Sequence, residues 1–266
     1  MLSSTHPGTP WPLGSSLTKR GVNFSVAAPA ANRMELLLFE NGSSRAPERV
    51  IELDCRKHRS GDYWHVEVEG LGEGCCYGYR AFGPLAPGAH GFRPSKVLLD
   101  PAARAITGWD VYDRMLATGP STNAHACLKA VVTEREAFDF QAHPRPRNSW
   151  QKTVIYELHV GSFTNRADSG VEEARRGTYL GLIEKLPYLQ ELGITAIELL
   201  PVFAFDPADA PPGRDNVWGY SPLSWFTPHA GYSTEPDPHK ARQEFRSLVA
   251  ACHDAGIEVL LDVVYN

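Results

Sequence analysis

The side chains best suited to acid–base chemistry are carboxyl groups in the short apolar runs of the second half of the chain. Glu157 and Glu198 lie in the middle of two such runs, and Asp262 lies near the end of a third. Carboxyl groups are common general acids and bases in enzymes. A carboxylate in the middle of a buried strand needs a hydrogen-bond or ion-pair partner, because burying a lone charge is costly. We therefore expect Glu157 and Glu198 to be paired inside the fold.

Aromatic side chains gather in the long segment 201–238, which is rich in proline and glycine. Trp218, Tyr220 and Trp225 lie close together there. Such a cluster can offer flat apolar surfaces to a ligand, or it can pack within its own loop. We take this cluster as a candidate surface for ligand contact.

Other familiar chemistries lack their residue pattern. His159 has no tightly spaced His or Cys partner with which to bind a metal. Cys75 and Cys76 are adjacent, so they form neither a Cys-x-x-Cys redox pair nor a zinc knuckle. The glycines within 72–78 precede no predicted helix, which argues against a phosphate-binding loop.

Composition bounds the class of protein. The chain has 266 residues, 42% of them apolar, and a net charge of −5 offers no overall basic surface for nucleic acid or anionic lipid. No segment approaches the roughly 20 apolar residues of a membrane span, and the N-terminus lacks the apolar core of a secretory signal. Five cysteines, an odd number, suit a reducing compartment. We expect a cytoplasmic globular protein with no cofactor and no nucleic-acid or membrane partner.

The elements of the first half are predicted to be short strands. Five runs are separated by turn residues: Val22–Ala28, Arg33–Phe39, Arg49–Leu53, Tyr63–Val68 and Tyr77–Phe82. Short strands at regular spacing predict an antiparallel β-sandwich of immunoglobulin-like type. Four aromatic residues could form an exposed platform, but core packing is the preferred interpretation: Tyr63, Trp64, Tyr77 and Tyr79.

From residue 154 onward, strands and helices alternate. Three nearly continuous apolar runs are typical of strands buried on both faces: 154–160, 196–200 and 259–264. A helical pattern at 178–192 contains Pro187, which should end one helix and open another. A second helix is expected at 240–255. Repeated strand–helix units predict a parallel sheet, but three strands are too few to complete one, so we expect a truncated domain ending at Asn266.

Several segments, in order, resemble the N-terminal part of a family 13 glycoside hydrolase of the α-amylase superfamily. The segment GVNFSVAAPAANRMELLLFE is similar to the start of a family 48 carbohydrate-binding module, and TVIYELHVGSFT is similar to the first barrel strand. The segment NVWGYSPLSWFTPHAGY resembles the loop after the second barrel strand, and LLDVVYN resembles the third-strand motif. In particular, these segments resemble bacterial glycogen debranching enzymes of isoamylase type. The resemblance implies a multidomain β and α/β fold. Residues 1–100 would form a β-sandwich, 101–152 a connector, and 153–266 the first three strands of an incomplete (β/α)8 TIM barrel.

The function implied by the resemblance is α-1,6-glucan (glycogen) debranching by a retaining mechanism, which uses two carboxyl groups about 5–5.5 Å apart. The family places these groups on barrel strands beyond Asn266, so we expect no catalytic residue in this chain and no activity from it alone. Glu157 and Glu198 match no catalytic position of the family.

Four residues are expected to bind substrate: Tyr220, Trp218, Asp262 and Asn266. Tyr220 matches a family tyrosine that stacks on a sugar, and an aromatic face contacts a pyranose without competing for its hydroxyl groups. Asp262 and Asn266 match the third-strand motif. The implied partner is an α-glucan polysaccharide such as glycogen or starch, and we assign no metal.

Two other functions stay open. One is a non-catalytic glycogen-binding protein that keeps the family's appearance. The other is a related enzyme, either a branching transferase or a trehalose-releasing hydrolase, because YELHVGSFT also suits the latter group. HGFRPSKVLLDPAARA and the loop DPADAPPGRDNVWGYSP look more like debranching enzymes.

Overall fold

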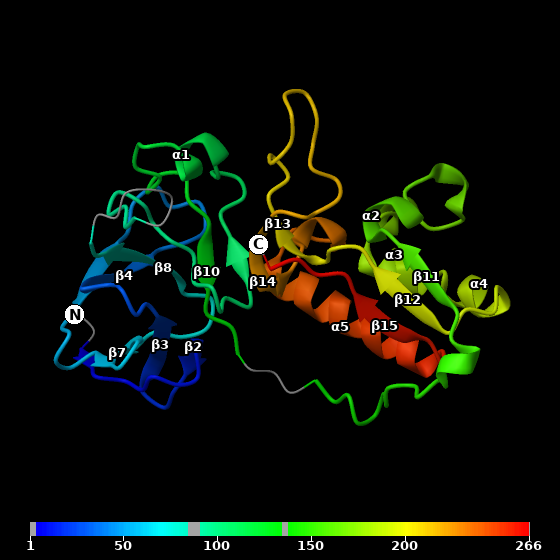
Figure 1. Ribbon diagram of the computed structural model, residues 1–266, viewed down its shortest axis with the longest axis horizontal. Helices are drawn as coiled ribbons and strands as arrows, with labels where there is room; N and C mark the ends of the chain where they lie inside the picture. Colours follow the sequence, from blue (N-terminus) through cyan, green and yellow to red (C-terminus); the bar gives the residue numbers. More distant parts are fainter. Residues whose placement is uncertain (1–3, 85–90, 135–137, 266) are drawn as a thin grey trace. The chain divides into compact units, whose positions relative to one another are not determined.

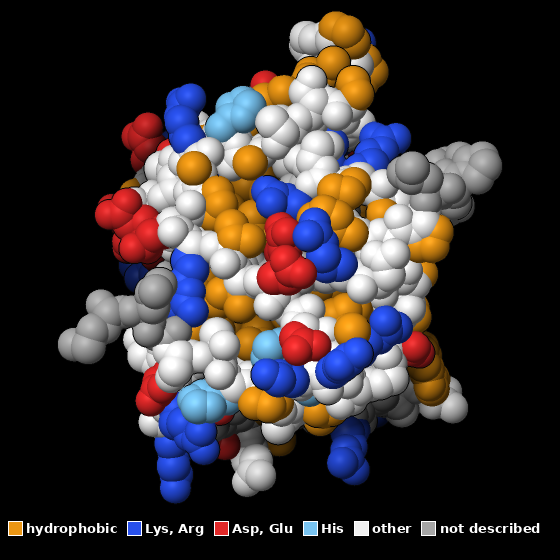
Figure 2. Space-filling view, turned by 90° about the vertical axis from the view of Figure 1, so that its left-hand side faces the viewer, with side chains coloured by type: hydrophobic (Ala, Val, Ile, Leu, Met, Phe, Trp, Pro, Cys, Tyr) orange, Lys and Arg blue, Asp and Glu red, His pale blue; other side chains and the backbone are white. Residues whose placement is uncertain are grey.

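The computed structural model describes residues 4–84, 91–134 and 138–265 (Figure 1). The chain divides into two compact units, Met1–Arg135 and Glu136–Asn266. Within the described ranges, none of the helices combines the length and the apolar character needed to cross a membrane. Figure 2 shows a face on which acidic and basic side chains are interspersed among apolar patches.

The first unit contains two antiparallel sheets. One sheet has the order β1-β7-β3-β2 with β6 beside β7, and the other has the order β5-β4-β8-β10-β9. The first sheet is built from β1 (Thr5–His6), β2 (Gly14–Leu17), β3 (Gly21–Ala27), β6 (Arg59–Ser60) and β7 (Tyr63–Glu69). The second is built from β4 (Arg33–Phe39), β5 (Arg49–Leu53), β8 (Cys76–Phe82), β9 (Ile106–Thr107) and β10 (Lys129–Val131), and a short helix α1 (Arg114–Thr118) follows β9. The predicted antiparallel β architecture is confirmed.

Aromatic side chains form the core between these sheets. Phe24 of β3 and Tyr77 of β8 meet edge to face across the two sheets, with ring centroids 4.8 Å apart. Trp64 and Tyr79 are also buried, whereas Tyr63 is 37% exposed. Three of the four aromatic residues considered for an exposed platform are therefore core residues.

The segment interpreted as a connector also contributes strands to the first unit. Ala130 of β10 lies opposite Tyr77 of β8, and Lys129 lies opposite Thr107 of β9. The boundaries 1–100, 101–152 and 153–266 remain a prediction.

The second unit is built on a parallel sheet of order β11-β12-β15. Its strands are β11 (Ile155–Leu158), β12 (Ala196–Leu199) and β15 (Glu258–Leu261), with a separate antiparallel hairpin of β13 (Phe203–Phe205) and β14 (Pro222–Pro228). Its helices are α2 (Val160–Phe163), α3 (Tyr179–Ile183), α4 (Leu186–Glu191) and α5 (Pro238–Asp254). Single 3-10 turns lie at η1 (Trp150–Lys152), η2 (Ala167–Ser169), η3 (Glu173–Arg175) and η4 (Ala230–Tyr232). The predicted parallel β/α units are confirmed, and the described strands form no closed barrel.

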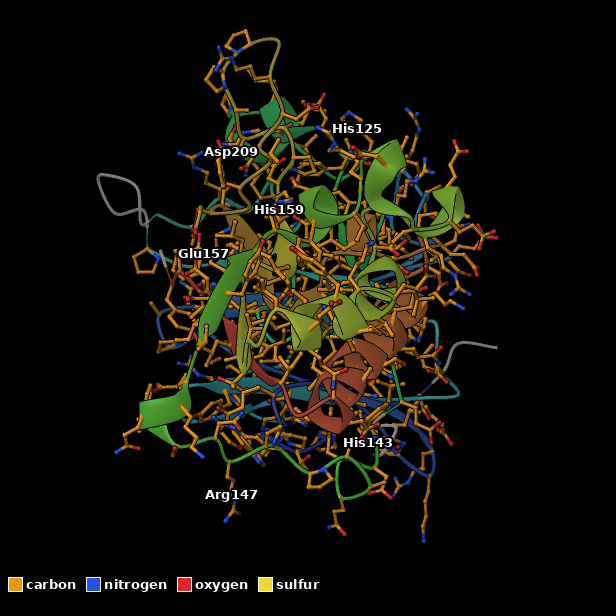
Figure 3. The ribbon with its side chains drawn as sticks, turned by 90° about the vertical axis from the view of Figure 1, so that its right-hand side faces the viewer. His125, His143, Arg147, Glu157, His159 and Asp209 are labelled. Carbon is orange, nitrogen blue, oxygen red and sulfur yellow. The ribbon has the colours of Figure 1, made fainter. Side chains whose placement is uncertain are left out.

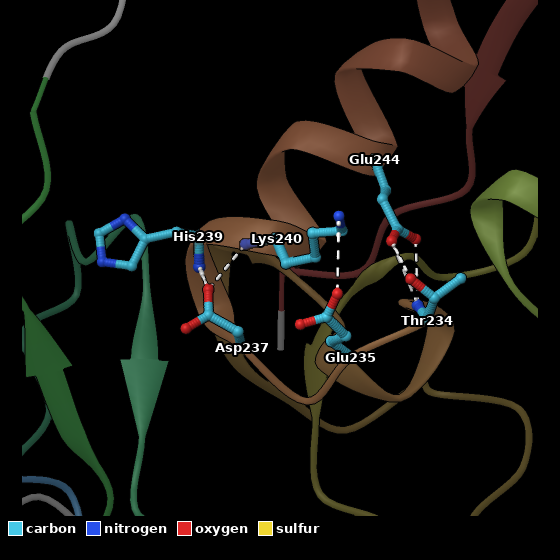
Figure 4. A network of polar contacts seen from close by, with 6 residues as sticks. All are labelled: Thr234, Glu235, Asp237, His239, Lys240 and Glu244. Atoms are coloured by element: carbon cyan, nitrogen blue, oxygen red, sulfur yellow. Dashed lines mark hydrogen bonds and ion pairs between the residues drawn. The ribbon is translucent and has the colours of Figure 1, made fainter.

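Local sequence signals set the helix ends. The predicted helix at 178–192 breaks as expected, because α3 ends at Ile183 and Pro187 lies in the first turn of α4, where its missing N–H costs nothing. The helix expected at 240–255 is α5, capped by Asp237, whose carboxylate accepts hydrogen bonds from the backbone N–H groups of His239 and Lys240 (Figure 4).

The helices of the described part of the chain pack on one face of the parallel sheet. The helices pack on the face that carries Leu158, Ile197 and Leu199, all of which belong to one apolar core. On the opposite face, Ile155 is 46% exposed and Glu157 is exposed. The expectation of strands buried on both faces is therefore wrong for β11, because side chains alternate along a strand and the described helices cover one side.

Candidate functional site

The candidate site lies at the edge of the parallel sheet where the strands end. Leu158, Leu199 and Leu261 occupy matching positions in the three strands. The ladder extends one residue further, because the Asp262 N–H donates to the carbonyl of Leu199 at 2.9 Å. His159 and Asp262 therefore leave their strands at the same edge of the sheet. Figure 3 shows Glu157 and His159 near this end of β11, with Asp209 in the loop beyond them.

The loop after β12 carries Tyr220 to this edge, and Asn216 folds it. The Asn216 side-chain amide donates to the carbonyl of Asp206 at 3.1 Å and to the Ser221 hydroxyl at 2.6 Å. Its oxygen accepts from the Gly219 N–H at 3.1 Å. Gly219 has a φ of +83° and is buried so close to Phe205 that a Cβ would lie 2.9 Å from the ring. Only glycine fits this turn without strain.

Tyr220 and Asp262 meet although they are 42 residues apart in the chain. The Tyr220 hydroxyl donates a hydrogen bond to the Asp262 carboxylate. This bond, together with partial burial and the charges of Asp262, Glu157 and Glu198, raises the pKa of Tyr220 to about 12. Tyr220 is still 38% exposed. The hydroxyl is thus held in place while part of the side chain remains open to a ligand.

The other candidate residues have different surroundings. Trp218 is 62% exposed beside Tyr220 in the chain. Trp225 donates its indole N–H to the carbonyl of Val264 at 2.9 Å, which ties the hairpin to the segment after β15. Asn266 lies outside the described residues.

Glu157 and Glu198 do not have the partners expected of buried carboxylates. Among the described residues, neither side chain makes a hydrogen bond or an ion pair, although both backbones take part in the ladder of the sheet. The expectation of pairing is therefore wrong in this structure, because the sheet face that carries Glu157 is open to water. Water can solvate these charges without a protein partner.

A group of aromatic and histidine side chains behind the edge was not foreseen as part of the site. The Tyr232 hydroxyl lies 2.9 Å from Nε2 of His159, and the same nitrogen lies 2.8 Å from the carbonyl of Val217. His229 stacks on Phe205 with ring centroids 4.0 Å apart, and burial lowers its pKa to about 4. From the sequence, we consider His159 only as a possible metal ligand. No local sequence pattern indicates a contact between His159 and a loop 58 residues away.

Among the residues that the structure places, no three His, Cys, Asp or Glu side chains come together in a way that could hold a metal ion. The chemical resources of the edge are an anchored tyrosine, an exposed tryptophan and three carboxylates.

Comparisons with known families agree with both units. Residues 12–103 match carbohydrate-binding module 48, the isoamylase N-terminal domain, and residues 155–266 match the α-amylase catalytic domain. The glycogen debranching enzyme of Klebsiella pneumoniae (strain 342) is 40% identical over 274 residues, which cover 100% of this chain and 40% of the relative. The chain thus spans about two fifths of the length of the curated relatives that it matches.

Solved structures show the same fold. The pullulanase from Bacillus acidopullulyticus superposes with a TM-score of 0.72 at 26% identity, covering 96% of this chain and 30% of the pullulanase. The maltotetraose complex of the pullulanase from Anoxybacillus sp. LM18-11 superposes with a TM-score of 0.68 at 26% identity, covering 96% of this chain and 35% of the pullulanase. The chain is thus a homologue of the bacterial glycogen debranching enzymes, with a carbohydrate-binding module 48 followed by part of an α-amylase catalytic domain.

Proposed function

We propose that this chain is the N-terminal part of an α-1,6-glucan debranching hydrolase and that the edge around Tyr220 binds a sugar unit of the glucan. The observation that carries the proposal is the anchored tyrosine: its hydroxyl is fixed by Asp262 and its side chain is partly open. A ring held in this way can stack on a pyranose without losing side-chain entropy on binding. The debranching relatives and the maltotetraose-bound pullulanase support an α-glucan such as glycogen as the ligand.

The remaining residues have supporting roles in this proposal. Trp218 offers a second apolar surface beside the stacked sugar. Asp262 holds the Tyr220 ring in its binding orientation through the hydroxyl group. We assign Asn266 to the same site on sequence resemblance alone. The proposed division is residues 1–100 for the sandwich, 101–152 for a connector that also contributes β9 and β10 to a sheet of the first unit, and 153–266 for the first barrel strands.

The electrostatics of the edge suit glycoside chemistry. Asp262, Glu157 and Glu198 lie close enough to Tyr220 for their charges to raise its pKa. Negative potential at this edge would stabilise the positive charge that develops on a sugar in an oxocarbenium-like transition state. In this proposal the nucleophile and the acid/base carboxyl of the retaining mechanism lie on strands beyond Asn266, and the chain alone is inactive. The five free thiols of the chain favour a cytoplasmic location.

The test is maltotetraose binding to the 266-residue chain, measured by calorimetry. Tyr220→Ala should weaken binding by about 5- to 30-fold, because a stacking ring contributes about 1–2 kcal/mol. Tyr220→Phe should be milder, since the ring remains and only the bond to Asp262 is lost. Melting temperatures should change little, because the side chain is partly exposed in a loop.

The matched control is Trp150→Ala. Trp150 is 86% exposed and precedes β11, at the opposite end of the strand. It should bind maltotetraose like the parent. Unchanged affinity in Tyr220→Ala, or an equal loss in Trp150→Ala, would contradict the assignment of the sugar site.

A further inference from the structure

We propose that His159 is a positioning residue, which holds the sugar-binding loop in place through the carbonyl of Val217. The proposal deepens the proposed function, because the loop so held is the one that carries Tyr220. Nε2 of His159 lies 2.8 Å from the Val217 oxygen, and Val217 is three residues before Tyr220. The contact joins the end of β11 to a loop that follows β12.

The hydrogen bonds of His159 decide where its proton lies. The backbone N–H of Ser162 donates to Nδ1 at 3.0 Å, so this nitrogen must present its lone pair. In neutral imidazole the proton is then on Nε2, which becomes the donor. Nε2–H faces two acceptor oxygens, the carbonyl of Val217 at 2.8 Å and the hydroxyl of Tyr232 at 2.9 Å. The hydrogen bond from Ser162 to Nδ1 therefore makes Nε2 a donor toward the loop.

Packing holds the imidazole plane. The Tyr232 ring meets the His159 ring edge to face, with centroids 5.5 Å apart, and Tyr232 is buried. Gly161 leaves the space that this packing needs, because a Cβ there would lie 3.0 Å from both rings. The donor is thus aimed by its surroundings before any ligand arrives, which is the condition for a positioning residue.

The loop segment from Asn216 to Tyr220 is therefore tied at successive points. Asn216 binds the base of the loop, His159 holds the Val217 carbonyl, and the Tyr220 hydroxyl binds Asp262. Loss of the middle tie should let the segment open more often and should reduce the fraction of molecules with Tyr220 in its binding position.

Two substitutions separate the contact of His159 with Val217 from its contact with Ser162. Asn in place of His159 keeps an acceptor at the position of Nδ1, so it can still accept from Ser162, but it is too short to reach Val217. Gln extends an amide N–H to the position of Nε2, so it can reach Val217, but it gives up the acceptor for Ser162. His159→Asn therefore removes the hydrogen bond to Val217 that holds the loop, and His159→Gln removes the hydrogen bond from Ser162.

The first measurement is amide hydrogen exchange across residues 216–221 in the 266-residue chain, which needs no ligand. His159→Asn should exchange about 3- to 10-fold faster there, the size expected for one net hydrogen bond, and His159→Gln should stay near the parent. The second measurement is maltotetraose affinity, which should fall by a similar factor in His159→Asn only. Parent-like exchange in His159→Asn, or equal changes in both variants, would overturn the proposal.

The two readouts keep this proposal separate from the function proposed above. If Tyr220→Ala binds maltotetraose like the parent, the sugar site is misassigned, yet the exchange of residues 216–221 still decides the role of His159. If Tyr220→Ala weakens binding while His159→Asn changes neither readout, the sugar site stands and the positioning role fails.

Discussion

The stability of the second unit should depend on pH through His229, whose imidazole is buried against Phe205. The ring is 8% exposed and stacks on Phe205 at an interplanar angle of 12°. Burial, with a smaller contribution from the charge of His159, lowers the pKa of His229 to about 4. In the unfolded chain the pKa of a histidine is about 6.5.

The sign follows from proton binding in the two states. Between about pH 6.5 and pH 4 the unfolded chain binds a proton at His229 that the folded chain does not. The free energy of unfolding therefore falls as the pH falls through this window. A difference of about 2.5 pKa units corresponds to a full loss of about 3 kcal/mol, of which about 2 kcal/mol is lost between pH 7.5 and pH 5.

The assay compares the parent with His229→Phe in urea unfolding at pH 7.5 and pH 5. Phenylalanine keeps a ring against Phe205 and removes the titrating nitrogen, so the variant should lose about 2 kcal/mol less than the parent on acidification. The first unit contains no part of this cluster, and its transition should shift equally in both proteins. An identical pH dependence of the second unit in parent and variant would refute the reasoning.

Three further predictions concern two buried carboxylates and catalysis. Burial raises the pKa of Asp100 to about 6. The protonated carboxyl therefore adds to the stability of the folded first unit at low pH, and this contribution is lost as the pH rises through about 6. In urea unfolding, Asp100→Asn should remove about 3 kcal/mol of this pH-dependent change in the free energy of unfolding. Glu244 is buried and accepts hydrogen bonds from Thr234 (Figure 4), so Glu244→Ala should cost about 2–3 kcal/mol in unfolding free energy, whereas Glu235→Ala, which breaks an exposed ion pair, should cost under about 1 kcal/mol. The pure chain should release no reducing ends from glycogen or pullulan above a blank, and measured release would disprove its predicted inactivity.

Local features of this protein could be predicted from its sequence. The short strands of the first unit follow from alternating side chains and turn residues, which act over a few positions. The break in the helix at Pro187 follows from one missing N–H. α4 ends at Glu191, and Gly193 two residues later adopts a φ of +81°, a conformation that glycine takes up most easily and that commonly ends helices.

Contacts between distant residues were decided by the tertiary structure. The sequence marked Tyr220 and Asp262 separately, but only the parallel register of β12 and β15 and the turn at Gly219 bring the hydroxyl to the carboxylate. The role of His159 also depends on a loop 58 residues away, and no spacing along the chain encodes that contact. The open sheet face was misjudged for the same reason: an apolar run indicates a strand that can be buried, while the elements that pack on it determine which face is covered.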